Sequence, residues 1–333
     1  MMMHTMTDIT QKRRKVSLVI PAYNEGRGLL RLREALQPLM DNNMRLTDDG
    51  REVGVYDYEV VIVNDGSRDD TLEVLRGLHA ADDRFCYVSL SRNFGKEAAM
   101  LAGLDYATGD CAVILDADLQ HPVDAIPRMI AEWEAGYDDV YGRRATRGRE
   151  SWLRKRMSLA YYRLLQSAST IDVLPNVGDF RLLDRRCIDA VRSLRETQRY
   201  SKGLFAWIGY RKKDVEFLTA DRAEGMSSFS YMRLFNLAVE GITSHSTAPL
   251  RIASVLGFIT AFASFLYLIF TVVRTLIYGD PVAGYPTLIS VILLLGGLQL
   301  CAIGIVGEYI GRIFMETKRR PVYIADIYND RKI

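Results

Sequence analysis

Short apolar runs alternate with helical patterns along residues 1–145 of the chain. The runs with the length and composition of buried strands are Val16–Ile20, Glu59–Val63, Cys86–Leu90 and Cys111–Leu115. The segments between them with a helical pattern are Gly28–Met40, Asp70–Ala80, Lys96–Ala107 and Asp124–Ala135. Strands that alternate with helices predict an α/β fold, in which a parallel-rich sheet carries helices on both faces.

The C-terminal third has a different pattern. Ile252–Val273 contains 22 residues without a formal charge, and Pro281–Gly307 contains 27. A helix needs about 20 apolar residues to cross a bilayer. Two transmembrane helices, at about 252–277 and 286–311, are therefore predicted. A pair of buried core helices is the alternative, and the absence of any polar stripe disfavours it.

The charges that flank these two segments predict their orientation. The link Thr275–Thr287 contains no Lys or Arg, whereas Arg251 precedes the first span and basic residues follow the second, namely Arg312, Lys318, Arg319 and Arg320. By the positive-inside rule both chain ends lie in the cytoplasm. Arg274 departs from this pattern, at a place where its side chain can reach the head groups. Glu308, four residues before Arg312, predicts a helical ion pair, with a functional carboxylate at the membrane edge as the alternative.

These patterns divide the chain into five parts. A basic tail, residues 1–15, precedes a cytoplasmic α/β domain at 16–225. Within that domain, residues 146–170 combine Arg and Lys with an apolar stripe and Trp152, which is typical of an interfacial helix, although packing against the domain core is the alternative. A juxtamembrane amphipathic helix at 226–250, the two spans at 251–314 and a cytoplasmic tail at 315–333 follow.

Charge and cysteine content exclude several classes of protein. The 43 Lys and Arg nearly balance the 41 Asp and Glu, so no global field favours nucleic acid. The four cysteines are scattered without a C-x-x-C spacing, which argues against a disulfide framework or a zinc site and suits a reducing compartment: Cys86, Cys111, Cys187 and Cys301.

Polar clusters follow all four predicted strands. They are Pro21–Glu25, Asn64–Ser67, Ser91–Glu97 and Asp116–Pro122. Asp65 alone is typical of a turn, and Lys96 alone of a solvated helix end. Strand ends at one sheet edge, however, form the ligand site of open α/β folds. Asp116 and Asp118 suit Mg2+ or Mn2+, which bind few carboxylates together with phosphate oxygens. Together the clusters predict a nucleotide pocket.

The motifs resemble those of glycosyltransferase family 2, and within it the polyisoprenyl-phosphate glycosyltransferases. They are LVIPAYNE (Leu18–Glu25), VNDGSRDDT (Val63–Thr71), SRNFGKEAA (Ser91–Ala99), DADLQHP (Asp116–Pro122), GDFRLLDRR (Gly178–Arg186), RYSKGLFAWIGYR (Arg199–Arg211), GEYIGRI (Gly307–Ile313) and KRRPVYI (Lys318–Ile324). The resemblance covers nearly the whole chain. It implies a GT-A fold, in which a nucleotide sugar donates its sugar to a lipid phosphate.

The resemblance also implies residue roles. Nucleotide-binding residues would be Pro21, Tyr23, Glu25, Asp65, Lys96, Asp116, Asp118 and Gln120. Asp116 and Asp118 would hold Mg2+ or Mn2+, and Asp118, Asp179 and Arg222 would be catalytic. The acceptor phosphate or the membrane interface would meet Arg147, Arg154, Arg181, Arg199, Lys202 and Arg222. Two residues depart from the family pattern: His121 replaces an Asp, and Ser228 replaces a Lys that would contact phosphate.

The implied reaction is an inverting transfer at the cytoplasmic face of the inner membrane. UDP-glucose is the first choice of donor, with GDP-mannose or a modified UDP-pentose as alternatives, and undecaprenyl phosphate is the expected acceptor. A processive polysaccharide synthase would carry Gln-x-x-Arg-Trp, which no Trp of this chain follows. A membrane-anchored nucleotide-binding scaffold is the non-enzymatic alternative. Glycines of the second span, such as Gly304 and Gly307, would permit close helix packing. A homo-oligomer is therefore predicted, and the resemblance suggests that it is a tetramer.

Overall fold

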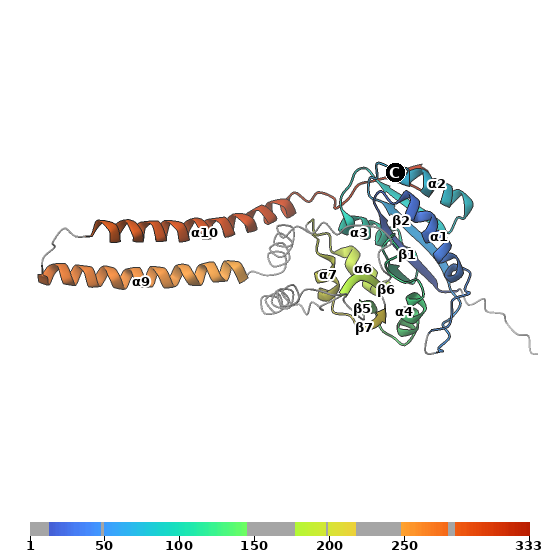
Figure 1. The fold of residues 1–333 in the computed structure, drawn as a ribbon, viewed down its shortest axis with the longest axis horizontal. Coiled ribbons are helices and arrows are strands. Elements are labelled where there is room, and N and C mark those ends of the chain that lie inside the picture. The colour runs from blue at the N-terminus through green and yellow to red at the C-terminus, as the bar shows by residue number, and fades with distance from the viewer. Residues whose placement is uncertain (1–12, 48–49, 145–176, 198, 218–247, 279–283) are drawn as a thin grey trace, which may run out of the picture. The chain divides into compact units, whose positions relative to one another are not determined.

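The computed structural model describes residues 13–47, 50–144, 177–197, 199–217, 248–278 and 284–333 (Figure 1). These residues divide into two compact units, an α/β unit and a helical hairpin. The predicted interfacial helix at 146–170 and residues 226–247 of the predicted juxtamembrane helix lie outside the described residues.

One mixed sheet forms the centre of the α/β unit (Figure 1). Its strands in the described residues are β1 (Lys15–Ala22), β2 (Asp57–Asn64), β3 (Phe85–Leu90), β4 (Cys111–Ile114), β5 (Asp139–Arg144), β6 (Val177–Asp184), β7 (Lys212–Phe217), β8 (Ala325–Tyr328) and β9 (Arg331–Lys332). They lie in the order β7-β5-β6-β4-β1-β2-β3-β8-β9. The four predicted strands are β1 to β4, and they are parallel to one another. β6 is antiparallel to β4 and β5, and β8 is antiparallel to β3 and β9. Because half of the strand pairings are antiparallel, the sheet is mixed and not parallel-rich as predicted.

Helices cover both faces of this sheet, as the alternating pattern predicted. They are α1 (Gly26–Met40), α2 (Thr71–Ala81), α3 (Lys96–Tyr106), α4 (Ala125–Glu134), α6 (Arg185–Ser193) and α7 (Ser201–Trp207). Successive side chains of a strand point to opposite faces. Leu18 of β1 accordingly packs in the same apolar cluster as Leu32 of α1, whereas its neighbour Val19 packs with Met100 of α3. Burial on both faces explains why the central strands are continuous apolar runs.

The register of the parallel strands brings their carboxyl ends to one edge. Ala22 is paired with Asn64, Asn64 with Ser89, and Val19 with Ile114. The loops that follow β1, β2, β3 and β4 therefore leave the sheet on the same side. All four predicted polar clusters begin at this edge.

The C-terminal segment contributes a strand that the sequence did not predict. β8 pairs with β3, and the amide of Ser91 donates a hydrogen bond of 2.9 Å to the carbonyl of Ile324. The Tyr323 hydroxyl donates to Asp105 Oδ2 at 2.7 Å, and Tyr328 packs on Tyr106 with 4.8 Å between ring centroids. Residues 321–333 of the predicted tail thus belong to the α/β unit.

The hairpin consists of α9 (Ala248–Tyr278) and α10 (Tyr285–Thr317), which lie side by side (Figure 1). The two helices contain both predicted spans. Within the described residues, Leu294–Thr317 alone is long and apolar enough to cross a bilayer, and the apolar stretch of α9, Val255–Tyr267, is shorter. Large apolar side chains such as Phe258 and Leu300 are exposed. Two membrane crossings therefore remain a prediction.

The predicted ion pair of the second span is confirmed. Arg312 Nη2 lies 3.0 Å from Glu308 Oε1, one helical turn away. The glycines of α10 make no close contact within the described chain, because a Cβ on Gly304 or Gly307 would meet no atom within 4 Å. Close packing of another helix against these glycines remains a prediction.

Candidate active site

The loops after β1 and β2 are joined by hydrogen bonds at the carboxyl edge of the sheet. Asn24, in the left-handed region with φ 55°, donates its amide to Ser67 Oγ at 2.9 Å and accepts the Arg68 amide at 2.9 Å. The amide of Glu25 donates to Thr71 Oγ1 at 3.0 Å. The motif residues of both loops are therefore held in one rigid arrangement.

Asp65 fixes the loop that follows β3. It is 3% exposed, and its two carboxylate oxygens accept the amides of Phe94 and Gly95 at 2.7 and 2.9 Å. Burial raises the pKa of Asp65 above its usual value, although these two amides favour the charged form. The next residue, Gly66, has φ +64°, and a side chain there would collide with the backbone of Arg92. Asp65 thus orders the loop that leads to Lys96, and its contact with a nucleobase remains a prediction.

Two other residues predicted to hold the nucleobase and ribose lie at the end of β1. Pro21 is the register partner of Val63, and Tyr23 is 43% exposed in the following loop. Nothing in the described residues covers the Tyr23 ring fully, so it is accessible to a ligand.

Lys96, the first residue of α3, joins two carboxylates from different strands. Its Nζ lies 2.6 Å from Asp116 Oδ1, after β4, and 2.9 Å from Asp179 Oδ2, on β6. Burial lowers the pKa of Lys96, but the charges of Asp179 and Asp116 outweigh this and raise it above the usual value. The structure therefore brings together three of the residues that the resemblance assigned to the site.

Carboxylates also gather around Glu25. Burial raises the pKa of Glu25, and the charges of Asp118, Asp69 and Asp116 raise it further, in that order. Asp118 Oδ1 accepts the amide of Gln120 at 3.0 Å. Oxygen ligands of this kind suit a hard divalent cation. No three His, Cys, Asp or Glu residues of the described chain form a complete metal site. The residues present thus fit Mg2+ or Mn2+ as a partner of a nucleotide's phosphates rather than as a protein-enclosed ion.

His121, the departure from the family pattern, lies beneath Asp116. It is 4% exposed, and its Nδ1 accepts the amide of Asp116 at 3.3 Å. The ring stacks on Phe180, with 4.8 Å between centroids and an interplanar angle of 10°, and meets the edge of Phe217. Phe180 follows Asp179 on β6. His121 therefore links the backbone of Asp116 to the strand that carries Asp179.

Asp179 combines burial with positive neighbours. Burial alone would raise its pKa, but the charges of Lys96 and Lys202 outweigh this and hold the pKa below its usual value. Its Oδ2 pairs with Lys96, whereas the buried Oδ1 has no hydrogen-bond partner among the described residues. An orphaned buried oxygen is costly, which favours a ligand group as its partner.

Arg181, predicted to meet the acceptor phosphate, forms a buried ion pair inside the domain. It is 4% exposed, and its Nη1 lies 3.1 Å from Oδ2 of the fully buried Asp139. The guanidinium also stands 3.9 Å from the centroid of the Phe205 ring. A ligand would have to break this buried pair to reach Arg181. We therefore assign Arg181 to the interior of the domain.

The remaining described basic residues of the prediction are Arg199, just before α7, and Lys202, the second residue of α7. Arg199 is buried and donates to the carbonyl of Leu194, and burial lowers its pKa. The charge of Lys202 lowers the pKa of Asp179, and its contact with the acceptor phosphate remains a prediction. Arg147, Arg154, Arg222 and Ser228 lie outside the described residues.

The structure adds Glu97, which sequence reasoning left without a role. Its carboxylate accepts both the amide and the hydroxyl of Ser201, at the start of α7. The signal available in the sequence was its place beside Lys96 in the SRNFGKEAA motif.

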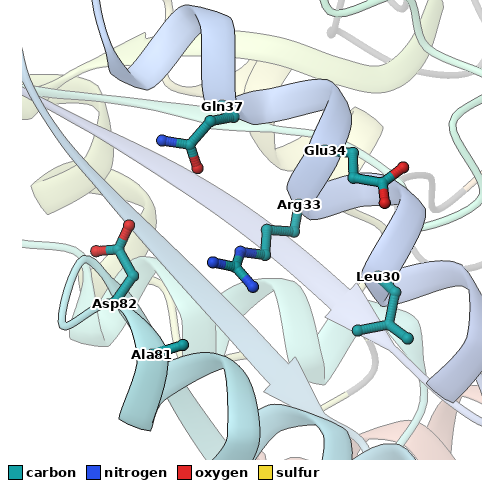
Figure 2. Close-up of a pocket in the computed structure, with 6 residues that line it drawn as sticks. All are labelled: Leu30, Arg33, Glu34, Gln37, Ala81 and Asp82. Atoms are coloured by element: carbon teal, nitrogen blue, oxygen red, sulfur yellow. The ribbon is translucent and has the colours of Figure 1, made fainter.

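A separate hollow of about 410 Å³ lies between α1 and α2 (Figure 2). Its lining consists of Leu30, Arg33, Glu34, Gln37, Ala81 and Asp82. None of these is a predicted site residue.

Comparison with known proteins assigns the chain to a family. Residues 17–192 match the profile of glycosyl transferase family 2, and residues 248–313 match that of the GtrB C-terminal hairpin. The bactoprenol glucosyl transferase of Shigella phage SfV is 42% identical over 93% of this chain and 97% of that protein. The chain belongs to glycosyltransferase family 2. The putative glycosyltransferase CsbB of Bacillus subtilis is also 42% identical, over 93% of this chain and 90% of that protein.

Two solved structures are similar to this glycosyltransferase at lower sequence identity. The glucosyl-3-phosphoglycerate synthase of Mycobacterium tuberculosis, in complex with Mn2+ and UDP-glucose, is 21% identical with a TM-score of 0.42 and covers 69% of this chain and 77% of that chain. A mannosyltransferase from Pyrobaculum calidifontis is 16% identical with a TM-score of 0.40, over 88% of each chain.

Proposed function

We propose that the chain transfers a sugar from a nucleotide sugar to a polyisoprenyl phosphate at the cytoplasmic face of the inner membrane. The observation that carries this proposal is the extent of its similarity to bactoprenol glucosyl transferases, which reaches 93% of the chain and includes both the catalytic domain and the hairpin. A lipid acceptor explains why a nucleotide-binding domain is attached to two long apolar helices.

The chemistry of the site supports this reaction. A lipid monophosphate is already an anion, so catalysis depends on positioning the reactants and on stabilising the leaving diphosphate. A divalent cation bound by Asp116 and Asp118 would neutralise charge on that diphosphate. Lys96, which pairs with Asp116, would contact the same phosphates.

Asp179 is the proposed centre of the acceptor side. Its pKa is depressed and its Oδ1 is unpaired among the described residues, so it is an ionised carboxylate with a free acceptor atom. It would orient the acceptor phosphate through Lys96 and Lys202, or accept its remaining proton. Attack from the side opposite the leaving diphosphate gives a single displacement with inversion.

The donor and the lipid belong to this proposal as well. UDP-glucose is our first choice, because the relatives from Shigella phages SfV and SfII, each 42% identical, are named bactoprenol glucosyl transferases. GDP-mannose or a modified UDP-pentose would be the alternatives, and undecaprenyl phosphate the lipid. We further propose that α9 and α10 each cross the membrane and that both ends of the chain lie in the cytoplasm. We also propose that the protein forms a homo-oligomer, specifically a tetramer.

Labelled nucleotide sugars and lipid extraction test the proposal. Membranes that contain the full chain are incubated with each donor in the presence of Mg2+ or Mn2+, and the lipid fraction is analysed for sugar. Labelled sugar on polyisoprenyl phosphate that forms only when this chain is present would support the proposed enzymatic activity. Nucleotide binding without labelled lipid under every donor would indicate the membrane-anchored scaffold instead.

A further inference from the structure

The first two side chains of α3 extend to different parts of the site. Lys96 reaches the carboxylates of Asp116 and Asp179, whereas Glu97 reaches Ser201, the first residue of α7. A single helical start therefore connects the donor side of the site to the element that carries Lys202.

Glu97, which lies on α3, accepts hydrogen bonds from the first residue of α7. Its Oε2 accepts the backbone amide of Ser201 at 3.0 Å and also the Ser201 hydroxyl. Tyr200, which precedes the helix, makes no capping hydrogen bond with its own side chain. The first amides of a helix have no partner within the helix and require one elsewhere. Glu97 supplies that partner to the buried Ser201.

The charges around Glu97 link it to the reaction centre. Burial raises the pKa of Glu97, and the charge of Asp179 raises it further, whereas Ser201 and Arg199 oppose the rise. Lys202, the neighbour of Ser201, in turn acts on Asp179 and lowers the pKa of that carboxyl. Ser201 and Lys202 are consecutive at the start of α7, so the hydrogen bonds of Glu97 fix the backbone from which the Lys202 side chain extends.

We propose that Glu97 is a positioning residue for the acceptor. By holding Ser201, it fixes the part of α7 that carries Lys202, so that Lys202 and Asp179 can both meet the acceptor phosphate. This role rests on the proposed lipid-phosphate acceptor. It is separate from nucleotide binding, because neither hydrogen bond of Glu97 involves the loops after β1 or β2.

The test compares variants of the full chain in lipid discs. Glu97→Ala removes both hydrogen bonds, Ser201→Ala removes the hydroxyl only, and Glu97→Gln keeps an acceptor oxygen. Glu73→Ala is the matched control, because Glu73 is an exposed acid in the first turn of α2. Two quantities are measured: kcat/KM for the polyisoprenyl phosphate, and the Kd of the nucleotide without acceptor.

We expect Glu97→Ala to lower kcat/KM for the acceptor about tenfold, the loss typical of a charge-assisted hydrogen bond, with the nucleotide Kd changed less than about twofold. Glu97→Gln restores most of the loss, and adding Ser201→Ala to Glu97→Ala changes little further. Equal losses in acceptor use and nucleotide binding, or additive effects of the two alanines, would overturn the proposal. A wild-type chain that forms no lipid product with any donor would overturn the proposed function instead, and this inference with it.

Discussion

The ammonium of Lys96 and the carboxylate of Asp116 form an ion pair of 2.6 Å at the place proposed for a divalent cation. A cation that binds Asp116 would lie within a few ångströms of the Lys96 charge. These two positive charges would share the single negative charge of Asp116 and repel each other unless a further anion binds between them. The diphosphate of a nucleotide is such an anion, so metal and nucleotide are expected to bind together.

Lys96→Met tests this coupling. Removing the ammonium should tighten Mn2+ binding to the nucleotide-free chain at least about fivefold, because the repulsion is lost. Turnover should fall, because the phosphates lose a contact. Titration of Mn2+ followed by electron paramagnetic resonance measures the affinity directly. Lys202→Met is the control, since its charge acts on Asp179 and is not paired with Asp116. Equal Mn2+ affinities of Lys96→Met and wild type would contradict the coupling.

Asp179→Asn tests the proposed acceptor carboxylate. The amide keeps the shape of the side chain but loses its charge, so kcat should fall by about a hundredfold or more, whereas the Kd of the nucleotide should change less than about threefold. Single-turnover assays and equilibrium binding give the two values. Asp214→Asn is the control, because Asp214 lies on β7 and pairs with Arg143 of β5. Unchanged turnover of Asp179→Asn would remove Asp179 from the mechanism.

Sequence patterns predicted the parts of the fold that depend on local periodicity. β1 to β4 and the helices after them agree with the predicted segments to within two residues at each end, because buried parallel strands are continuous apolar runs with polar ends. The same reasoning placed Lys96, Asp116 and Asp118 at one edge. β8 escaped prediction because its sequence, Ala-Asp-Ile-Tyr, is not a continuous apolar run like that of the equally short β4.

Contacts between individual side chains on different strands could not be predicted from the sequence. Arg181 stands in a family motif, and an Arg beside Asp179 is naturally interpreted as a phosphate contact. Its actual partner, Asp139, lies on β5, a strand that no apolar pattern indicated. The role of Glu97 likewise depends on where α7 packs, which no local spacing specifies.

The buried pair of Arg181 and Asp139 predicts an asymmetric response to mutation. Arg181→Met alone leaves Asp139 charged and unpaired in the core, which should lower the free energy of unfolding by about 3–5 kcal/mol. The double variant Arg181→Met with Asp139→Leu should recover most of this loss, because no buried charge remains. Denaturant unfolding of the full chain measures both. If the folded double variant had lost use of the acceptor lipid, Arg181 would have to return to the acceptor site.

His121 offers the last prediction, because it performs two tasks at once. His121→Phe keeps the stack on Phe180 but removes the Nδ1 atom that accepts the Asp116 amide, and His121→Asn offers an acceptor oxygen without the stack. We expect His121→Phe to fold with a thermal midpoint close to that of wild type and to bind the nucleotide with Mn2+ about tenfold more weakly, because the Asp116 backbone loses a buried partner. His121→Asn should instead lower the thermal midpoint, since aromatic stacking contributes about 1 kcal/mol beyond burial. Calorimetric binding and thermal unfolding separate the two effects. Equal behaviour of both variants in both measurements would show that the ring only fills space.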